Sequence, residues 1–155
     1  MIFLRKDKKM EYLSHSPEES IELGKKIAQK LHKNQVILLC GDLGAGKTKL
    51  TEGILTYFGL ENEISSPTFA IVNEYNTDSL DIFHFDLYRL EDIDEFLAIG
   101  GEEFFTKGAS LIEWGELIEP ILPKDYIKIT INKSNEDENL RTITIDCFGN
   151  EEMSL

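Results

Sequence analysis

A glycine-rich stretch, "GDLGAGKT" at residues 41–48, constrains the fold of this chain more than any other feature. It matches the pattern G-x-x-x-x-G-K-[ST] at every fixed position. The apolar run "VILLC" (36–40) comes directly before it, and a helical segment to about residue 58 comes directly after it. A strand, a glycine loop and a helix in this order are the context in which the pattern binds phosphate groups. The sequence therefore predicts an α/β domain in which a buried strand leads into a phosphate-binding loop.

The residue types of this loop suit the phosphates of a nucleotide. Glycines let the backbone curl until successive N–H groups point inward, and the helix that follows adds the positive end of its dipole. Lys47 is a mobile cation for the β- and γ-phosphates, and the Thr48 hydroxyl is a ligand for Mg²⁺. We therefore predict a nucleotide and Mg²⁺ as ligands of the loop residues, which are Leu43, Gly44, Ala45, Gly46, Lys47 and Thr48.

The rest of the chain alternates between helical and strand patterns. Ser16, Pro17 and Glu19 form a helix start, and apolar residues then recur at helical spacing to about His32, with Asn34 as the stop signal. Beyond the loop, strands are predicted at 69–75, 80–88, 109–113, 125–132 and 140–147, and short helices near 92–98 and 102–106. These elements predict a three-layer P-loop NTPase fold, with a mixed, mainly parallel sheet between helices. We predict one domain over residues 1–155, with residues 148–155 as a frayed tail.

Composition narrows the possible partners and compartment. The net charge is −13, with 10 Lys/Arg against 6 Asp/Glu in residues 1–50 and 6 against 23 in residues 51–155. An acidic surface argues against direct binding of DNA or RNA and suits a basic protein partner. No apolar run is long enough to span a membrane. Cys40 and Cys147 lie in apolar runs, where buried thiols in a reducing cytoplasm are expected.

A phosphate site of this kind needs a further carboxylate after an apolar strand. Two strand ends compete for this role, because "LDIFHFD" ends in Asp86 and "SLIE" ends in Glu113, with Trp114 next. Strand alternation places His84 on the same side as Asp86. Ligands of open α/β sheets bind at the carboxyl ends of strands, so both acids are predicted near the phosphates. Position along the chain does not separate their roles.

Two further loops carry possible nucleotide contacts. In "SSPTF" (65–69), Thr68 offers a hydroxyl to the γ-phosphate or its metal, although a simple capped turn is the alternative. "NKSN" (132–135) imitates a guanine-reading motif, but its last residue, Asn135, lacks the carboxylate that accepts two hydrogen bonds from guanine. We therefore predict a hairpin turn there and no guanine specificity from this feature.

Four motifs together resemble one family. "GDLGAGKT", "SSPTFAIVNEY", "HFDLYRL" and "LIEWGE" occur here in the order and spacing of the TsaE (YjeE) family, small P-loop ATPases needed for the threonylcarbamoyladenosine modification of tRNA. The resemblance extends from the "SPEES" helix to the strand that carries Arg141. The first motif alone would indicate only a P-loop protein, whereas the conjunction of the four is far more specific.

The resemblance implies a cytoplasmic bacterial protein that binds ATP and Mg²⁺ and hydrolyses ATP slowly by itself. It implies TsaB and TsaD as protein partners, and action on tRNA only through their complex, at adenosine 37. By motif, Thr48 and Glu113 would hold Mg²⁺, Asp86 would be a catalytic or water-orienting group, and Thr68 a switch residue. Lys47 would stabilise the reacting phosphates, and Trp114 would neighbour the nucleotide. The metal-ligand role of Glu113 rests on the resemblance alone.

Two other classes of function remain open at this point. A P-loop small-molecule kinase would share the loop, but it usually has an arginine-rich lid, and the arginines of this chain are Arg5, Arg89 and Arg141. A nucleotide-gated interaction module without significant turnover would share the loop as well. Phosphate release to water, compared with transfer to an added acceptor, separates a hydrolase from a kinase. A pull-down with ATP, ADP and a non-hydrolysable analogue identifies a gated module.

Overall fold

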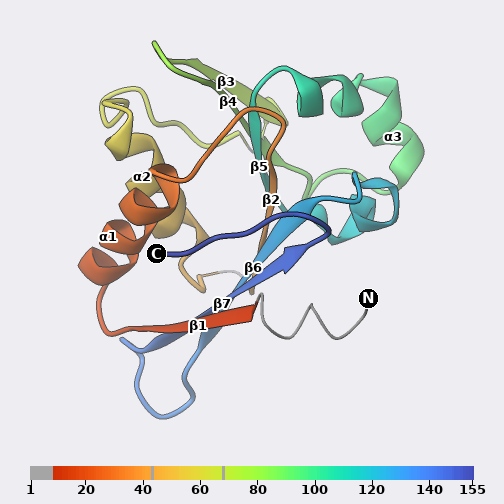
Figure 1. Ribbon diagram of the computed structural model, residues 1–155. Helices are drawn as coiled ribbons and strands as arrows, with labels where there is room; N and C mark the ends of the chain where they lie inside the picture. Colours follow the sequence, from red (N-terminus) through yellow and green to blue (C-terminus); the bar gives the residue numbers. More distant parts are fainter. Residues whose placement is uncertain (1–8, 43, 68) are drawn as a thin grey trace.

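One mixed sheet organises the molecule. The computed structural model describes residues 9–42, 44–67 and 69–155. Across this part of the chain, seven strands pair in the order β1-β7-β6-β2-β5-β4-β3 (Figure 1). The strands are β1 (Lys9–Ser14), β2 (Val36–Cys40), β3 (Val72–Asn76), β4 (Asp81–Asp86), β5 (Ala109–Glu113), β6 (Tyr126–Lys133) and β7 (Arg141–Phe148). The helices are α1 (Pro17–Ala28), α2 (Lys47–Tyr57) and α3 (Ile93–Ala98), with the 3₁₀ helices η2 (Gly101–Thr106) and η3 (Gly115–Ile121).

The centre of the sheet is parallel and its edges are antiparallel. Strands β4, β5, β2 and β6 run in one direction, while β7, β1 and β3 add antiparallel pairs outside them. All five residues of β2 are buried, as the continuous apolar run predicted for a central parallel strand. The predicted mixed sheet is confirmed. Its four parallel strands end beside one another at the edge where the glycine loop begins.

Helices cover both faces of the sheet and complete the three layers. Ile37 and Leu39 of β2 belong to a core cluster shared with α1 and α2, including Ile27 and Ile54. Val36 and Leu38 point to the other face, into a second cluster that contains Phe96 of α3, Phe105 of η2 and Ile118 of η3. Figure 1 shows α1 and α2 together on one side of the sheet and α3 on the other. No described helix is long and apolar enough to cross a membrane.

Two glycines let α1 and α2 approach closely. A Cβ atom on Gly24 would collide with the backbone oxygen of Leu50, and one on Gly53 would collide with the backbone oxygen of Ile21. Any larger residue at either position would therefore push the two helices apart. Since α2 begins at the end of the glycine loop, this close crossing also fixes where the loop's helix lies on the sheet.

Helix α1 begins as predicted and ends earlier. The Ser16 side chain accepts a hydrogen bond from the Glu19 N–H, and Pro17 occupies the first turn. The Glu19 carboxylate accepts the backbone N–H of His15, one residue before the cap, so the capping box is displaced by one position. The helix ends at Ala28, not near residue 32. The chain then turns through Asn34, which has a left-handed backbone (φ 72°).

The remaining differences from prediction lie at the ends of the chain and in short elements. Strand β1 and helix η3 were not predicted, and β3 begins at Val72. The turn over residues 134–140 connects β6 to β7 as an antiparallel hairpin, as predicted. The prediction of a frayed tail from residue 148 is wrong. Met153 packs in the core, and the buried Glu151 carboxylate accepts a hydrogen bond from the Gln35 amide (3.0 Å).

Candidate functional site

The glycine loop connects the end of β2 to the start of α2 with a backbone that only glycine adopts easily. Gly44 and Gly46 have φ angles of 79° and 115°. Gly46 is also the N-cap of α2 and has no side chain to bond the first helical N–H groups. A Cβ atom on Gly41 would meet the Ile131 carbonyl. The loop therefore presents backbone N–H groups at the N-terminus of an 11-residue helix, the arrangement that binds phosphate.

A cavity of about 360 Å³ opens beside this loop. It brings most of the predicted site residues together, although they come from distant parts of the chain. Its lining consists of Gly44, Gly46, Lys47, Thr48, Lys49, Ser66, Asp86, Glu113 and Trp114. Ala45 is instead buried in the core. The predicted contacts of Leu43 and Thr68 lie outside the described residues.

Lys47 lies against the wall of this cavity. The residue is 6% exposed. Its Nζ atom donates a hydrogen bond to the Gly41 carbonyl (2.7 Å) and lies 3.9 Å from the centre of the Trp114 ring. Trp114 itself has a left-handed backbone (φ 58°), and its ring contacts that of Tyr88 with centroids 5.0 Å apart. The ammonium group is thus held by a carbonyl and an aromatic face, and it must leave one or both to bind a phosphate.

Two neighbouring parallel strands deliver the two carboxylates. Asp86 ends β4 and Glu113 ends β5, and the two residues are paired in register. Glu113 Oε2 lies 2.6 Å from His84 Nε2, and the two side chains are 12% and 6% exposed. Asp86 Oδ1 accepts a hydrogen bond from the backbone N–H of Tyr88 (3.0 Å). The acids therefore lie side by side at the cavity but have different hydrogen-bond partners.

The residues at the cavity fit Mg²⁺ bound together with a nucleotide. No group of three or more His, Cys, Asp or Glu side chains forms a ready metal site within residues 9–42, 44–67 and 69–155. Mg²⁺ does not need one, because it keeps several waters and is bound through one or two carboxylates plus substrate phosphates. Thr48, Glu113 and Asp86 supply hard oxygen donors around a single cavity. This donor set suits Mg²⁺ rather than a softer metal.

Several residues at or near the site were not predicted to take part. Ser66 and Lys49 line the cavity, and His84 holds Glu113. Arg141 Nε donates to the Ala45 carbonyl (2.9 Å) and so contacts the glycine loop from β7. The alternation of β4 already placed His84 on the side of Asp86, but the bond to Glu113 depends on which strand lies next to β4. Arg89 lies over the exposed Phe69 ring (4.4 Å).

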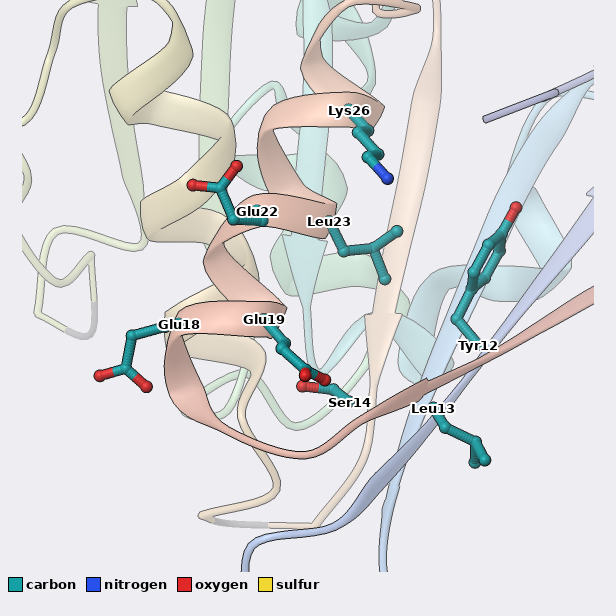
Figure 2. A pocket seen from close by; sticks show the side chains of 8 residues that line it. All are labelled: Tyr12, Leu13, Ser14, Glu18, Glu19, Glu22, Leu23 and Lys26. Atoms are coloured by element: carbon teal, nitrogen blue, oxygen red, sulfur yellow. The ribbon is translucent and has the colours of Figure 1, made fainter.

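A second hollow, of about 340 Å³, lies between β1 and α1, away from the predicted site. Its lining is Tyr12, Leu13, Ser14, Glu18, Glu19, Glu22, Leu23 and Lys26, and it shares no residue with the loop cavity. Figure 2 shows Leu23 of α1 and Tyr12 of β1 facing the space between the two elements. It contains neither a phosphate-binding loop nor a strand-end pair of acids, so the loop cavity is the candidate functional site.

Comparison with known proteins points to one family. The family model described as "Threonylcarbamoyl adenosine biosynthesis protein TsaE" matches residues 14–143. The chain is 39% identical over 143 residues to the tRNA threonylcarbamoyladenosine biosynthesis protein TsaE of Bacillus subtilis, covering 92% of this chain and 89% of the relative. It is 41% identical over 135 residues to the protein of the same name from Haemophilus influenzae, covering 83% and 85%.

A solved structure agrees with the sequence matches. The crystal structure of Bacillus subtilis YdiB superposes with a TM-score of 0.73 at 34% identity, covering 92% of this chain and 88% of that one. The match therefore extends over most of the chain, not only over the glycine loop. The chain belongs to the TsaE family of threonylcarbamoyl adenosine biosynthesis proteins.

Proposed function

We propose that this protein is the Mg²⁺-dependent ATP-binding and ATP-hydrolysing component of the bacterial machinery that makes N6-threonylcarbamoyladenosine at position 37 of tRNA. It acts in the cytoplasm with TsaB and TsaD. The observation that supports this proposal is the single cavity that joins the glycine loop, Lys47 and Thr48 to Asp86 and Glu113. Family membership supports a role in threonylcarbamoyladenosine biosynthesis, and the residues of the cavity support ATP binding and hydrolysis.

The glycine loop and Lys47 would bind the phosphates. Backbone N–H groups of residues 44–48 surround the β-phosphate, and the N-terminus of α2 adds its positive dipole end. Lys47 moves from the Gly41 carbonyl and the Trp114 ring onto the β- and γ-phosphate oxygens. Because this cation is already inside the cavity, binding needs a short side-chain movement and no rearrangement of the fold.

Thr48 and Glu113 would hold the metal ion, and Asp86 would act on water. A metal ion held there would supply positive charge against the phosphate oxygens. Asp86 orients the attacking water and accepts its proton as the water oxygen bonds to the γ-phosphorus and the bond to the bridging oxygen breaks. Asp86 suits this role because it lines the same cavity from the adjacent strand end.

A smaller hollow that also borders the glycine loop would take the nucleoside. It measures about 140 Å³ and shares Gly44, Gly46 and Lys49 with the phosphate cavity. Its remaining lining comes from the start of α1, the β6–β7 turn and the first residue of β7, namely Ser16, Pro17, Ser20, Glu138, Asn139 and Arg141. A nucleotide with its phosphates in the larger cavity can therefore place its nucleoside across the loop.

Slow turnover of the isolated chain follows from the charges at the site. The cationic side chains in the lining of the cavity are those of Lys47 and Lys49. Phosphoryl transfer enzymes commonly add an arginine that stabilises the transition state and accelerates turnover by 10³–10⁵-fold. The partner complex would complete the site, either directly or by moving Arg89 off Phe69. The net charge of −13 favours protein partners over direct contact with tRNA.

The decisive experiment is an ATPase assay of the chain alone and with TsaB, TsaD and tRNA. We expect slow Mg²⁺-dependent phosphate release alone and clear stimulation by the partners. Lys47→Ala should lose both activities, because it removes the cation from the phosphate site. Absence of stimulation would contradict the proposal. Phosphate transfer to an added acceptor in place of release to water would instead identify a kinase.

A further inference from the structure

We propose that His84 is a positioning residue for Glu113. Its Nε2–H bond holds one carboxylate oxygen, so that the other oxygen is presented to a divalent cation in the cavity. This inference rests on the function proposed above, and it assigns His84 a part in metal binding without contact to the metal.

The geometry of the strands makes this contact specific. His84 lies on β4, two residues before Asp86, while Glu113 is the residue of β5 that pairs with Asp86. The Glu113 side chain therefore reaches back along the neighbouring strand to the imidazole, where Oε2 and Nε2 are 2.6 Å apart. With 6% and 12% of their side chains exposed, both groups are shielded from bulk water. A shielded bond to a carboxylate is stronger than the same bond at the surface.

In the described structure, the bond to Glu113 is the one polar contact of the His84 imidazole. Its Nδ1 atom is buried and has no hydrogen-bond partner among the described residues. Because an ionised carboxylate can only accept, the hydrogen of the Nε2···Oε2 bond is on Nε2. The ring therefore acts as a fixed donor aimed at Glu113. A histidine kept only to fill the core would not need this alignment.

Orientation of a carboxylate affects how well it binds a metal. A glutamate has several rotatable bonds, and fixing them at the moment of binding costs conformational entropy. Hydrogen bonds from neighbouring groups fix such ligands beforehand, and removing the neighbour typically lowers metal affinity by about 10–100-fold. His84 is placed to supply this effect for Glu113. It would leave the phosphate loop unaffected, because the imidazole is not among the residues that line the cavity beside the loop.

The test uses the full chain and a fluorescent ADP analogue, titrated at a series of Mg²⁺ concentrations and in EDTA. His84→Leu keeps much of the volume and removes the donor, whereas His84→Gln restores an N–H donor near the position of Nε2. We expect His84→Leu to raise the Mg²⁺ concentration needed for half-maximal binding by about 10–100-fold. Binding in EDTA should be unchanged, and His84→Gln should remain within a few-fold of the unmodified protein.

Matched variants separate positioning from stability. Ser110→Ala alters another fully buried polar residue on the neighbouring strand, whose Oγ has no described hydrogen-bond partner, and should leave the Mg²⁺ dependence unchanged. If His84→Leu does not fold, His84→Asn replaces it. The shorter amide cannot reach Glu113, so the same loss is expected. Thermal unfolding of every variant identifies any effect that stability alone explains.

The outcomes are distinct. Unchanged Mg²⁺ dependence in His84→Leu, an equal loss of binding in EDTA, or a failure of His84→Gln to restore binding would each overturn the positioning role. If the unmodified protein binds the nucleotide without any dependence on Mg²⁺, the proposed function and the positioning role both fail. If the unmodified protein shows that dependence and His84→Leu shows it equally, only the positioning role fails.

Discussion

Asp86 and Glu113 are paired in register at the ends of neighbouring parallel strands, yet their environments differ. Glu113 is bonded across the strands to the buried His84, so its carboxylate is fixed by the sheet. Asp86 accepts the N–H of Tyr88, two residues later, a bond within its own turn. A ligand fixed by the sheet suits a metal ion with strict geometry. An acid held by a turn suits a water molecule whose position changes during the reaction.

The largest effect is expected from Asp86→Asn. Asparagine keeps an oxygen acceptor for the Tyr88 N–H but cannot take a proton from water. We expect partner-stimulated ATP hydrolysis to fall by about 10²–10⁴-fold. Nucleotide affinity and its Mg²⁺ dependence should stay within a few-fold. Unchanged turnover would contradict the catalytic role of Asp86. It would also contradict the proposed functional difference between the two acids.

Glu113→Gln tests the metal-ligand role of the second acid. The amide keeps an oxygen near His84 but lacks the charge that attracts Mg²⁺. We expect the Mg²⁺ concentration for half-maximal nucleotide binding to rise by about 100-fold, the upper end of the effect of losing a supporting residue. A double variant with His84→Leu should bind scarcely worse than Glu113→Gln alone, because both changes act through one carboxylate. Additive losses would show that His84 acts elsewhere.

Trp114, the sole tryptophan of the chain, reports on Lys47 by its fluorescence. In the proposed function the ammonium group moves from the ring to a phosphate, so nucleotide should change the emission spectrum. Asp86→Asn should give the same change as the unmodified protein, and Lys47→Met should give a much smaller one. An unaltered spectrum on saturation with nucleotide would mean that Lys47 stays on the ring.

The smallest effect is expected from Glu119→Gln, which removes a paired carboxylate outside the site. Burial raises the pKa of Glu119, but hydrogen bonds from Tyr126 and Lys128 outweigh it and hold the pKa below its ordinary value of 4.5. The stabilisation is therefore present at neutral pH and is lost as pH falls through that lowered pKa. We expect urea unfolding at pH 7 to show a loss of up to about 1 kcal/mol and a smaller loss at pH 3. A larger loss at pH 3 than at pH 7 would contradict this sign.

Sequence reasoning succeeded where the signal was local. The apolar strand, the glycine loop and the cap at Ser16 depend on residues within a few positions of one another. The different surroundings of Asp86 and Glu113 could not be predicted in this way, because they depend on β4 lying beside β5 in a particular register. The burial of Met153 depends likewise on distant packing partners. Strand β1 was missed because its alternation of polar Lys9 and Glu11 with apolar Met10 and Tyr12 is only four residues long.

The bond between Arg141 and the Ala45 carbonyl has a consequence for the direction of the next peptide group. A trans peptide is planar, so its C=O and the N–H of the following residue point in opposite directions. By holding the oxygen of Ala45, the guanidinium group sets the orientation of the Gly46 N–H. This matters because Gly46 has no side chain to restrict its φ angle. A cation on β7 thereby determines the direction of a backbone N–H group at the N-terminus of α2.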